Sequence, residues 1–142
     1  MMIVPDMGSD TAARRAPPAS ASLLEAAIER GGLHPFFHAK VAMSTRKIVG
    51  VEALARIATP QMGFASPAAY VELAERNQRI DALTYAMTRA VAKHVVEFDG
   101  LPCSINISPM SLERVEFADR MEAAVREAGL DCKPFTLAVT ES

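Results

Sequence analysis

The sequence of 142 residues contains no tryptophan, only two cysteines and little excess charge. Cys103 and Cys132 stand far apart, with no CxxC spacing and no histidine cluster nearby, which indicates a reduced protein of the cytoplasm. No apolar run approaches the roughly 20 residues of a membrane span, so we expect no membrane partner. The net charge of −2 gives no basic surface for general attraction to nucleic acid, so we expect no DNA partner.

Half of the residues are hydrophobic, which is enough for one globular domain with a core. Residues 1–20 carry turn-forming and charged side chains without periodicity, and we predict a flexible N-terminal tail there. Residues 21–142 are predicted to form the domain.

The first half of the domain alternates between helix and strand signals. Ser22 to Glu25 matches a capping box and predicts a helix start. Strands are predicted at 36–42 and 48–56, and the short polar turn between them makes them antiparallel. Ser66-Pro67 is typical of a helix start, and a longer amphipathic helix is predicted at 80–98.

The second half continues with a predicted strand at 102–107. Ser108-Pro109 is predicted to start a helix that ends at Gly129 and buries Leu112, Val115, Met121 and Val125. A last strand is predicted at 135–140. Because helices separate the later strands, those strands need parallel crossovers, so the order predicts an α/β fold with one antiparallel strand at the front.

Three of these strands end in polar side chains. The first brings Glu52 and Arg56 to one face, the second brings Asn106, and the third brings Glu141. Strand ends converge at one rim of a parallel barrel, where active sites lie. Carboxylate and amide oxygens suit magnesium, manganese or calcium, and an arginine at the same rim suits a phosphate.

Each of these side chains also has an ordinary structural interpretation. Glu52 can stand at a sheet edge or pair with Arg56, because a carboxylate in an apolar strand needs compensation. Asn106, followed by Ser-Pro, can be a cap or turn former. Glu141 can be solvated. The residues alone leave these alternatives open beside the metal site.

The sequence resembles the EAL domain family, the cyclic di-GMP phosphodiesterases of bacterial signalling. Five blocks carry the resemblance in order over about residues 33 to 142: FHAKV at 37–41, GVEALAR at 50–56, YVELAE at 70–75, SINIS at 104–108 and TES at 140–142. They are similar to the family's YQPKV, EALAR, FIPLAE, VNIS and ITES.

The resemblance implies a TIM-type (β/α)8 barrel with a rim site for Mg2+ or Mn2+. It implies Glu52, Asn106 and Glu141 as metal ligands, and His38, Leu54 and Arg56 as contacts to cyclic di-GMP. His38 stands where the family has glutamine. Two metals would activate a water that opens one phosphodiester bond and gives pGpG.

The family's adjacent aspartates, catalytic lysine and later glutamate and glutamine all follow the TES block. A TIM barrel takes about 250 residues, so residues 21–142 are expected to be a truncated EAL domain, the first half of the barrel, with no complete catalytic set. We therefore expect this chain to be inactive as a phosphodiesterase. The alternative is a non-catalytic EAL-like module that forms a homo-oligomer, pairs with another barrel domain through its open edges, or binds cyclic di-GMP without cutting it.

Overall fold

The computed structural model describes residues 19–60, 63–65 and 67–140. The elements follow in the order α1 (Ala21–Glu29), β1 (Leu33–Val41), β2 (Ile48–Thr59), β3 (Gly63–Ala65), α2 (Ala68–Arg76), α3 (Ile80–Ala92), the 3-10 helix η1 (Val95–Phe98), β4 (Cys103–Ile107), α4 (Pro109–Leu112), α5 (Phe117–Glu127) and β5 (Phe135–Val139). The predicted alternation of helices and strands is confirmed. The tail predicted at 1–20 lies almost entirely outside the described residues.

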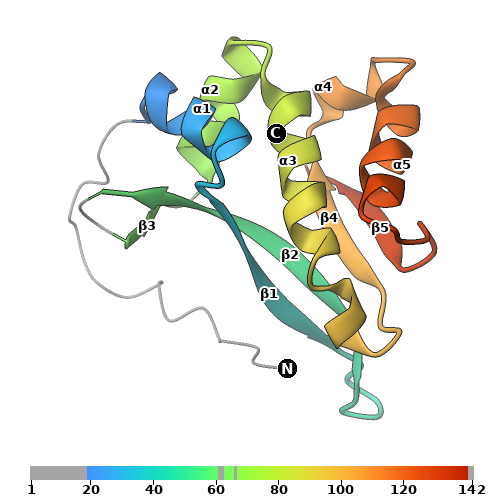
Figure 1. The fold of residues 1–142 in the computed structure, drawn as a ribbon. Helices are drawn as coiled ribbons and strands as arrows, with labels where there is room; N and C mark the ends of the chain where they lie inside the picture. The colour runs from blue at the N-terminus through green and yellow to red at the C-terminus, as the bar shows by residue number, and fades with distance from the viewer. Residues whose placement is uncertain (1–18, 61–62, 66, 141–142) are drawn as a thin grey trace.

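The strands form one open sheet in the order β1-β2-β4-β5, with the short β3 paired to β2 (Figure 1). The β1–β2 pair is antiparallel, while β2–β4 and β4–β5 are parallel, as predicted. A bulge interrupts the β1–β2 register: Lys40 pairs with Gly50 but Val41 pairs with Ile48, so Val49 is an extra residue in β2. Within the described chain, β1 and β5 are the outer strands of this order, and the short β3 forms a further edge beside the end of β2.

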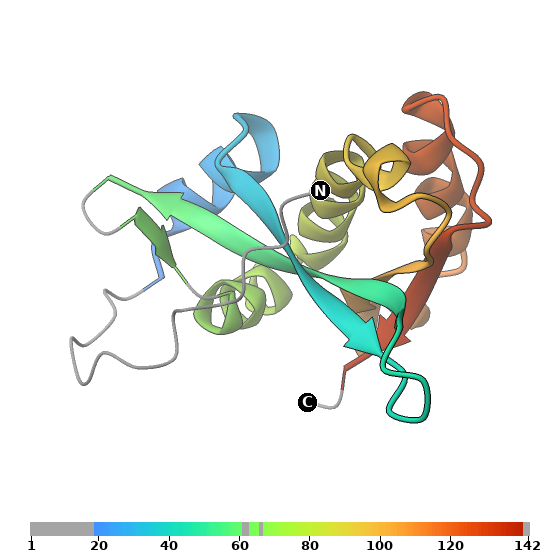
Figure 2. The ribbon, with the colours of Figure 1, turned by 90° about the horizontal axis from the view of Figure 1, so that it is seen from below.

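The two faces of the sheet differ in chemistry because successive side chains of a strand point to opposite sides. On the helix-facing side, Val51, Ala53, Cys103 and Ile105 are buried in the main hydrophobic core. Helix α3 lies along this side, and α5 lies beside α3 near β5 (Figures 1 and 2). The burial of apolar surface between helices and sheet supplies the main stabilisation.

Three predictions about the helices need correction. The first helix begins two residues early, because Ser20 and not Ser22 is its N-cap and accepts a hydrogen bond from the Leu23 amide. Glu25, the expected partner in the capping box, instead accepts two hydrogen bonds of 2.8 Å from the Arg79 guanidinium. This bidentate pair joins α1 to the start of α3.

The long helix predicted at 80–98 is two elements. Helix α3 ends at Ala92, and η1 continues to Phe98 with tighter i to i+3 bonding. The tighter winding still buries Val95 and Phe98, so the apolar periodicity continues past the end of α3 and predicted one long helix. Asp99 then takes a left-handed conformation with φ 54° and ends the segment.

The helix predicted after Ser108-Pro109 is also broken, into α4 and α5. Leu112 and Val115 were predicted to face inward, but they are 56% and 95% exposed. A polar anchor explains the difference: the buried Ser111 hydroxyl donates to Asp81 at 2.6 Å, and this bond fixes the turn with Leu112 outside. The helix start predicted at Ser108-Pro109 is confirmed, and the Ser108 hydroxyl caps it by accepting a hydrogen bond from the Met110 amide at 3.2 Å.

Candidate functional site

A row of polar side chains crosses the face of the sheet that is turned away from the core. His38 on β1 pairs with Glu52 on β2, and Glu52 pairs with Ser104 on β4. Residues paired across neighbouring strands share a face, so these three side chains lie next to one another. We call His38, Glu52, Ser104, Asn106 and Lys40 the polar row.

Glu52 and Asn106 meet in the polar row. The Asn106 amide Nδ2 donates to Glu52 Oε1 at 2.9 Å, and the two residues are far apart in sequence. With its nitrogen directed at Glu52, Asn106 keeps its amide oxygen Oδ1 as an acceptor. A carboxylate side chain and an amide side chain are therefore held side by side, and both are half-buried.

Lys40 is the residue of this site that the sequence reasoning missed. Its ammonium Nζ donates to the Ser104 hydroxyl at 2.6 Å, and the Ser104 hydroxyl reaches the Val51 carbonyl at 3.4 Å. The period of two along a strand places Lys40 on the same face as His38, but its contact with Ser104 depends on the register of the strands. The row thus also contains a cation.

His38 lies in the row with one ring nitrogen without a partner. The Nε2 atom is buried and makes no hydrogen bond within the described part of the chain. Leaving a buried nitrogen of this kind unpaired costs about 1–3 kcal/mol. The atom can accept a proton donor or bind a metal ion in its neutral form.

Arg56 and Leu54 lie further along β2 on the same face. The Arg56 guanidinium donates to the Ala55 carbonyl at 2.9 Å and lies 5.5 Å from the centre of the Phe36 ring. Leu54 lines a cavity of about 120 Å3 beside Asn106. The cavity is lined by residues at and beyond the last β2–β4 pair, Ala53 with Ile105.

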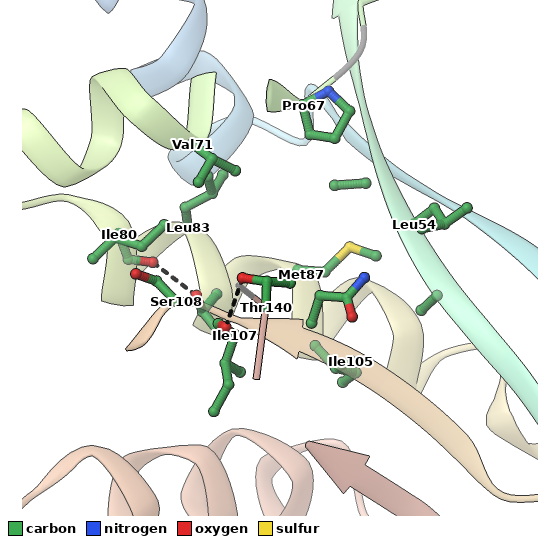
Figure 3. Close-up of a pocket in the computed structure, with 14 residues that line it drawn as sticks. Leu54, Pro67, Val71, Ile80, Leu83, Met87, Ile105, Ile107, Ser108 and Thr140 are labelled. Carbon is green, nitrogen blue, oxygen red and sulfur yellow. Dashed lines mark hydrogen bonds between the residues drawn. The ribbon is translucent and has the colours of Figure 1, made fainter. Parts of the chain in front are cut away.

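The cavity is mostly apolar, and Figure 3 shows how its walls come from both sheet and helices. Leu54 stands on one side, and Val71, Leu83 and Met87 stand opposite. The Thr140 hydroxyl donates to the Ile107 carbonyl at 3.1 Å and ties the chain after β5 to the end of β4. Glu141, the third metal ligand implied by the resemblance, lies outside the described residues.

The strand-end serine, Ser108, has a structural role. Its hydroxyl caps α4 and also donates to the Glu75 carboxylate at 2.6 Å, which links α4 to α2.

On the core side, burial raises the pKa of the Cys103 thiol to about 11, a shift that the nearby Lys40 ammonium opposes. Cys103 is therefore a protonated core residue at neutral pH.

The donors of the polar row fit a divalent metal ion. Glu52 offers a carboxylate, Asn106 an amide oxygen and His38 an unpartnered ring nitrogen. No group of three or more His, Cys, Asp or Glu side chains close enough to hold a metal ion occurs among residues 19–60, 63–65 and 67–140. The remaining ligands would come from Glu141, water or further protein groups.

The EAL domain family model matches residues 21–142, and this chain belongs to that family. A curated relative, a cyclic di-GMP phosphodiesterase of Pseudomonas aeruginosa, is 30% identical over 137 residues, which are 94% of this chain and 23% of the relative. The chain spans less than a quarter of the length of the curated relatives it matches.

Solved structures give the same fold. The PaMucR phosphodiesterase in complex with c-di-GMP is 27% identical, with a TM-score of 0.72 over 84% of this chain and 50% of that chain. The EAL domain of FimX from Pseudomonas aeruginosa, solved with c-di-GMP, is 18% identical with a TM-score of 0.71, over 83% of this chain and 48% of that one. The open sheet is thus part of a TIM-type barrel. In the part of the chain that the structure describes, no helix has the length and apolarity to span a membrane.

Proposed function

We propose that this chain supplies the first half of a metal-dependent cyclic di-GMP phosphodiesterase site. The observation that carries the proposal is the hydrogen bond of 2.9 Å from Asn106 Nδ2 to Glu52 Oε1, which holds two oxygen-bearing side chains together on adjacent parallel strands. In this proposal Glu52, Asn106 and Glu141 bind Mg2+ or Mn2+. Membership of the EAL family and the phosphodiesterases among its relatives support the assignment.

The substrate contacts in the proposal are Arg56, Leu54 and His38. The guanidinium of Arg56 provides charge and paired donors for a phosphate of cyclic di-GMP. Leu54 presents an apolar surface at the cavity, and His38 stands beside Glu52. A bound divalent ion would lower the pKa of a water molecule and offset the charge of the phosphate.

We further propose that the 142 residues by themselves do not turn over cyclic di-GMP to pGpG. The described residues bring Glu52 and Asn106 together but gather no group of three metal-binding acids, histidines or cysteines. A two-metal site needs ligands for both ions around the attacked phosphate. In this proposal the 142 residues act as a binding half-site that needs further metal ligands for turnover.

The test combines binding and turnover for the 142-residue chain with Mn2+. Isothermal titration calorimetry with cyclic di-GMP should give weak binding that Arg56→Ala and Glu52→Gln each weaken at least about fivefold. Arg89→Ala is the matched control, because Arg89 is an exposed arginine of α3 on the helix side. Release of pGpG above background, removed by Glu52→Ala, would overturn the proposed inactivity. Equal binding by all variants would overturn the half-site itself.

A second candidate is a non-catalytic EAL-like module that associates with itself or with another barrel domain. The observation in its favour is the edge strand β5, whose helix-side residues Leu137 and Val139 are 39% and 54% exposed. Unpaired strand edges with apolar neighbours invite pairing with another chain. Light scattering over a range of concentrations separates this candidate: a mass that rises with concentration supports it, and a strict monomer argues against it.

A third function, binding of cyclic di-GMP without cleavage, shares the polar row and Arg56 with the first. Calorimetry that shows no heat with the dinucleotide, with or without Mn2+, would remove it.

A further inference from the structure

We propose that His38, in addition to the substrate contact proposed above, is a metal ligand through Nε2, and that this nitrogen makes the site prefer first-row transition metals such as Zn2+ or Co2+ over Mg2+. The inference rests on the proposed metal site at Glu52 and Asn106 and adds a donor that the oxygen set does not contain. It starts from the buried Nε2 atom of His38, which has no hydrogen-bond partner in the described chain.

The position of His38 in the sheet supports the assignment. His38 and Glu52 are direct partners in the antiparallel β1–β2 register, so both side chains leave the sheet on the same face. Glu52 is in turn held by Asn106 at 2.9 Å. A nitrogen, a carboxylate and an amide oxygen therefore come from three neighbouring strands.

The surrounding bonds leave these donors available. Asn106 uses Nδ2 for Glu52, which leaves Oδ1 available as an oxygen ligand. Lys40 donates its hydrogen bond to Ser104 and not to the imidazole. A metal ion at Nε2 would remove the cost of about 1–3 kcal/mol that the unpaired buried nitrogen carries.

The chemistry of the donors sets the expected selectivity. Magnesium prefers oxygen ligands in a near-ideal octahedron, whereas imidazole suits zinc, cobalt, nickel and iron. One nitrogen added to two oxygens shifts the relative affinity toward those metals. His38→Gln is the diagnostic variant, because glutamine has a similar length and replaces the ring nitrogen with an amide.

The experiment measures the binding of Zn2+, Co2+ and Mg2+ to the 142-residue chain by calorimetry. We expect His38→Gln to lower the affinity for Zn2+ and Co2+ by about tenfold or more while leaving that for Mg2+ unchanged. His34→Gln is the matched control. It makes the same substitution on the same strand and face, and His34 is exposed and pairs with Arg56, away from Glu52.

A second measurement uses the wild-type chain and does not depend on a variant that folds. Side-chain nitrogen NMR resolves the ring nitrogens of the three histidines, His34, His38 and His94. Addition of Zn2+ should move the Nε2 signal of His38 and leave the other two in place, with His34→Gln identifying one of the others.

The outcomes separate this inference from the metal site it rests on. If Glu52→Gln removes all metal binding but His38→Gln leaves the ratio of Zn2+ to Mg2+ affinity unchanged, the inference is wrong and the metal site stands. If Glu52→Gln leaves every affinity unchanged, the metal site itself is wrong. An unmoved Nε2 signal of His38 at saturating Zn2+ also overturns the inference.

Discussion

The two faces of one sheet carry opposite chemistry on alternating residues of the same strands. On the helix side, Ala53 and Ile105 are almost fully buried, whereas on the other side Glu52 and Asn106 hold each other at 2.9 Å. The helix-side residues stabilise the fold through buried apolar surface, whereas the polar row places hydrogen-bonding groups, including the proposed metal ligands, on the opposite face. Core packing and the proposed binding site are thus separated at single-residue spacing along each strand.

The largest effect on the free energy of unfolding is expected from a substitution in the apolar core. Ile105 is 1% exposed, so Ile105→Ala should lower the free energy of unfolding by about 3 kcal/mol through lost contacts and the cavity left behind. Leu137→Ala is the matched control, because Leu137 pairs with Ile105 on the same face but is 39% exposed. It should cost less than about 1 kcal/mol. Urea denaturation measures both, and equal losses would contradict the separation.

A chemical probe sharpens the comparison next. Burial raises the pKa of Cys103 to about 11, so its thiolate fraction near pH 8 is about 100-fold below that of an ordinary thiol with a pKa of 9.0. Iodoacetamide should label native Cys132 first, with mass spectrometry as the readout, and both thiols should react in urea. Rapid labelling of native Cys103 would show that the core opens.

The raised pKa of Cys103 also predicts how the stability of the fold depends on pH. The protonated Cys103 thiol stabilises the folded state fully below pH 9.0, and this stabilisation is lost as the pH rises toward about 11. Replacement by alanine should flatten the fall of stability in that window.

The smallest effect is expected on the polar row. Lys40 is exposed, and its ammonium donates one hydrogen bond to Ser104. Lys40→Met should therefore change the free energy of unfolding by less than about 1 kcal/mol. Lys47→Met, in the exposed turn before β2, is the control for loss of one positive charge. A loss above about 2 kcal/mol would mean that the polar row supports the fold.

The sequence predicted most of the sheet because β2 and β4 are apolar runs bounded by clear turn residues. It did not predict β3, whose three residues are too few to show a period of two. It predicted too much burial for Leu112 and Val115. Their exposure depends on the hydrogen bond from Ser111 to Asp81, and this bond joins residues 30 positions apart, which a local pattern does not show.

The candidate site was predictable in part for the same physical reason. Because the ends of parallel strands lie at one rim, the sequence predicted that Glu52 and Asn106 would lie close together. Lys40 was missed because its partner Ser104 lies two strands away. Predicting that contact requires knowledge of the register of both the β1–β2 and the β2–β4 pairs. Local patterns carry no information about register between strands.

The bulge at Val49 has an evolutionary consequence. The turn at 42–47 and the bulge together can absorb an added or deleted residue, because neither lies under the polar row. The same change between Gly50 and Glu52 would exchange the two faces of β2 and drive Glu52 into the core. Descendants of this gene can therefore vary the turn in length, but they can alter this stretch of β2 only by substitution.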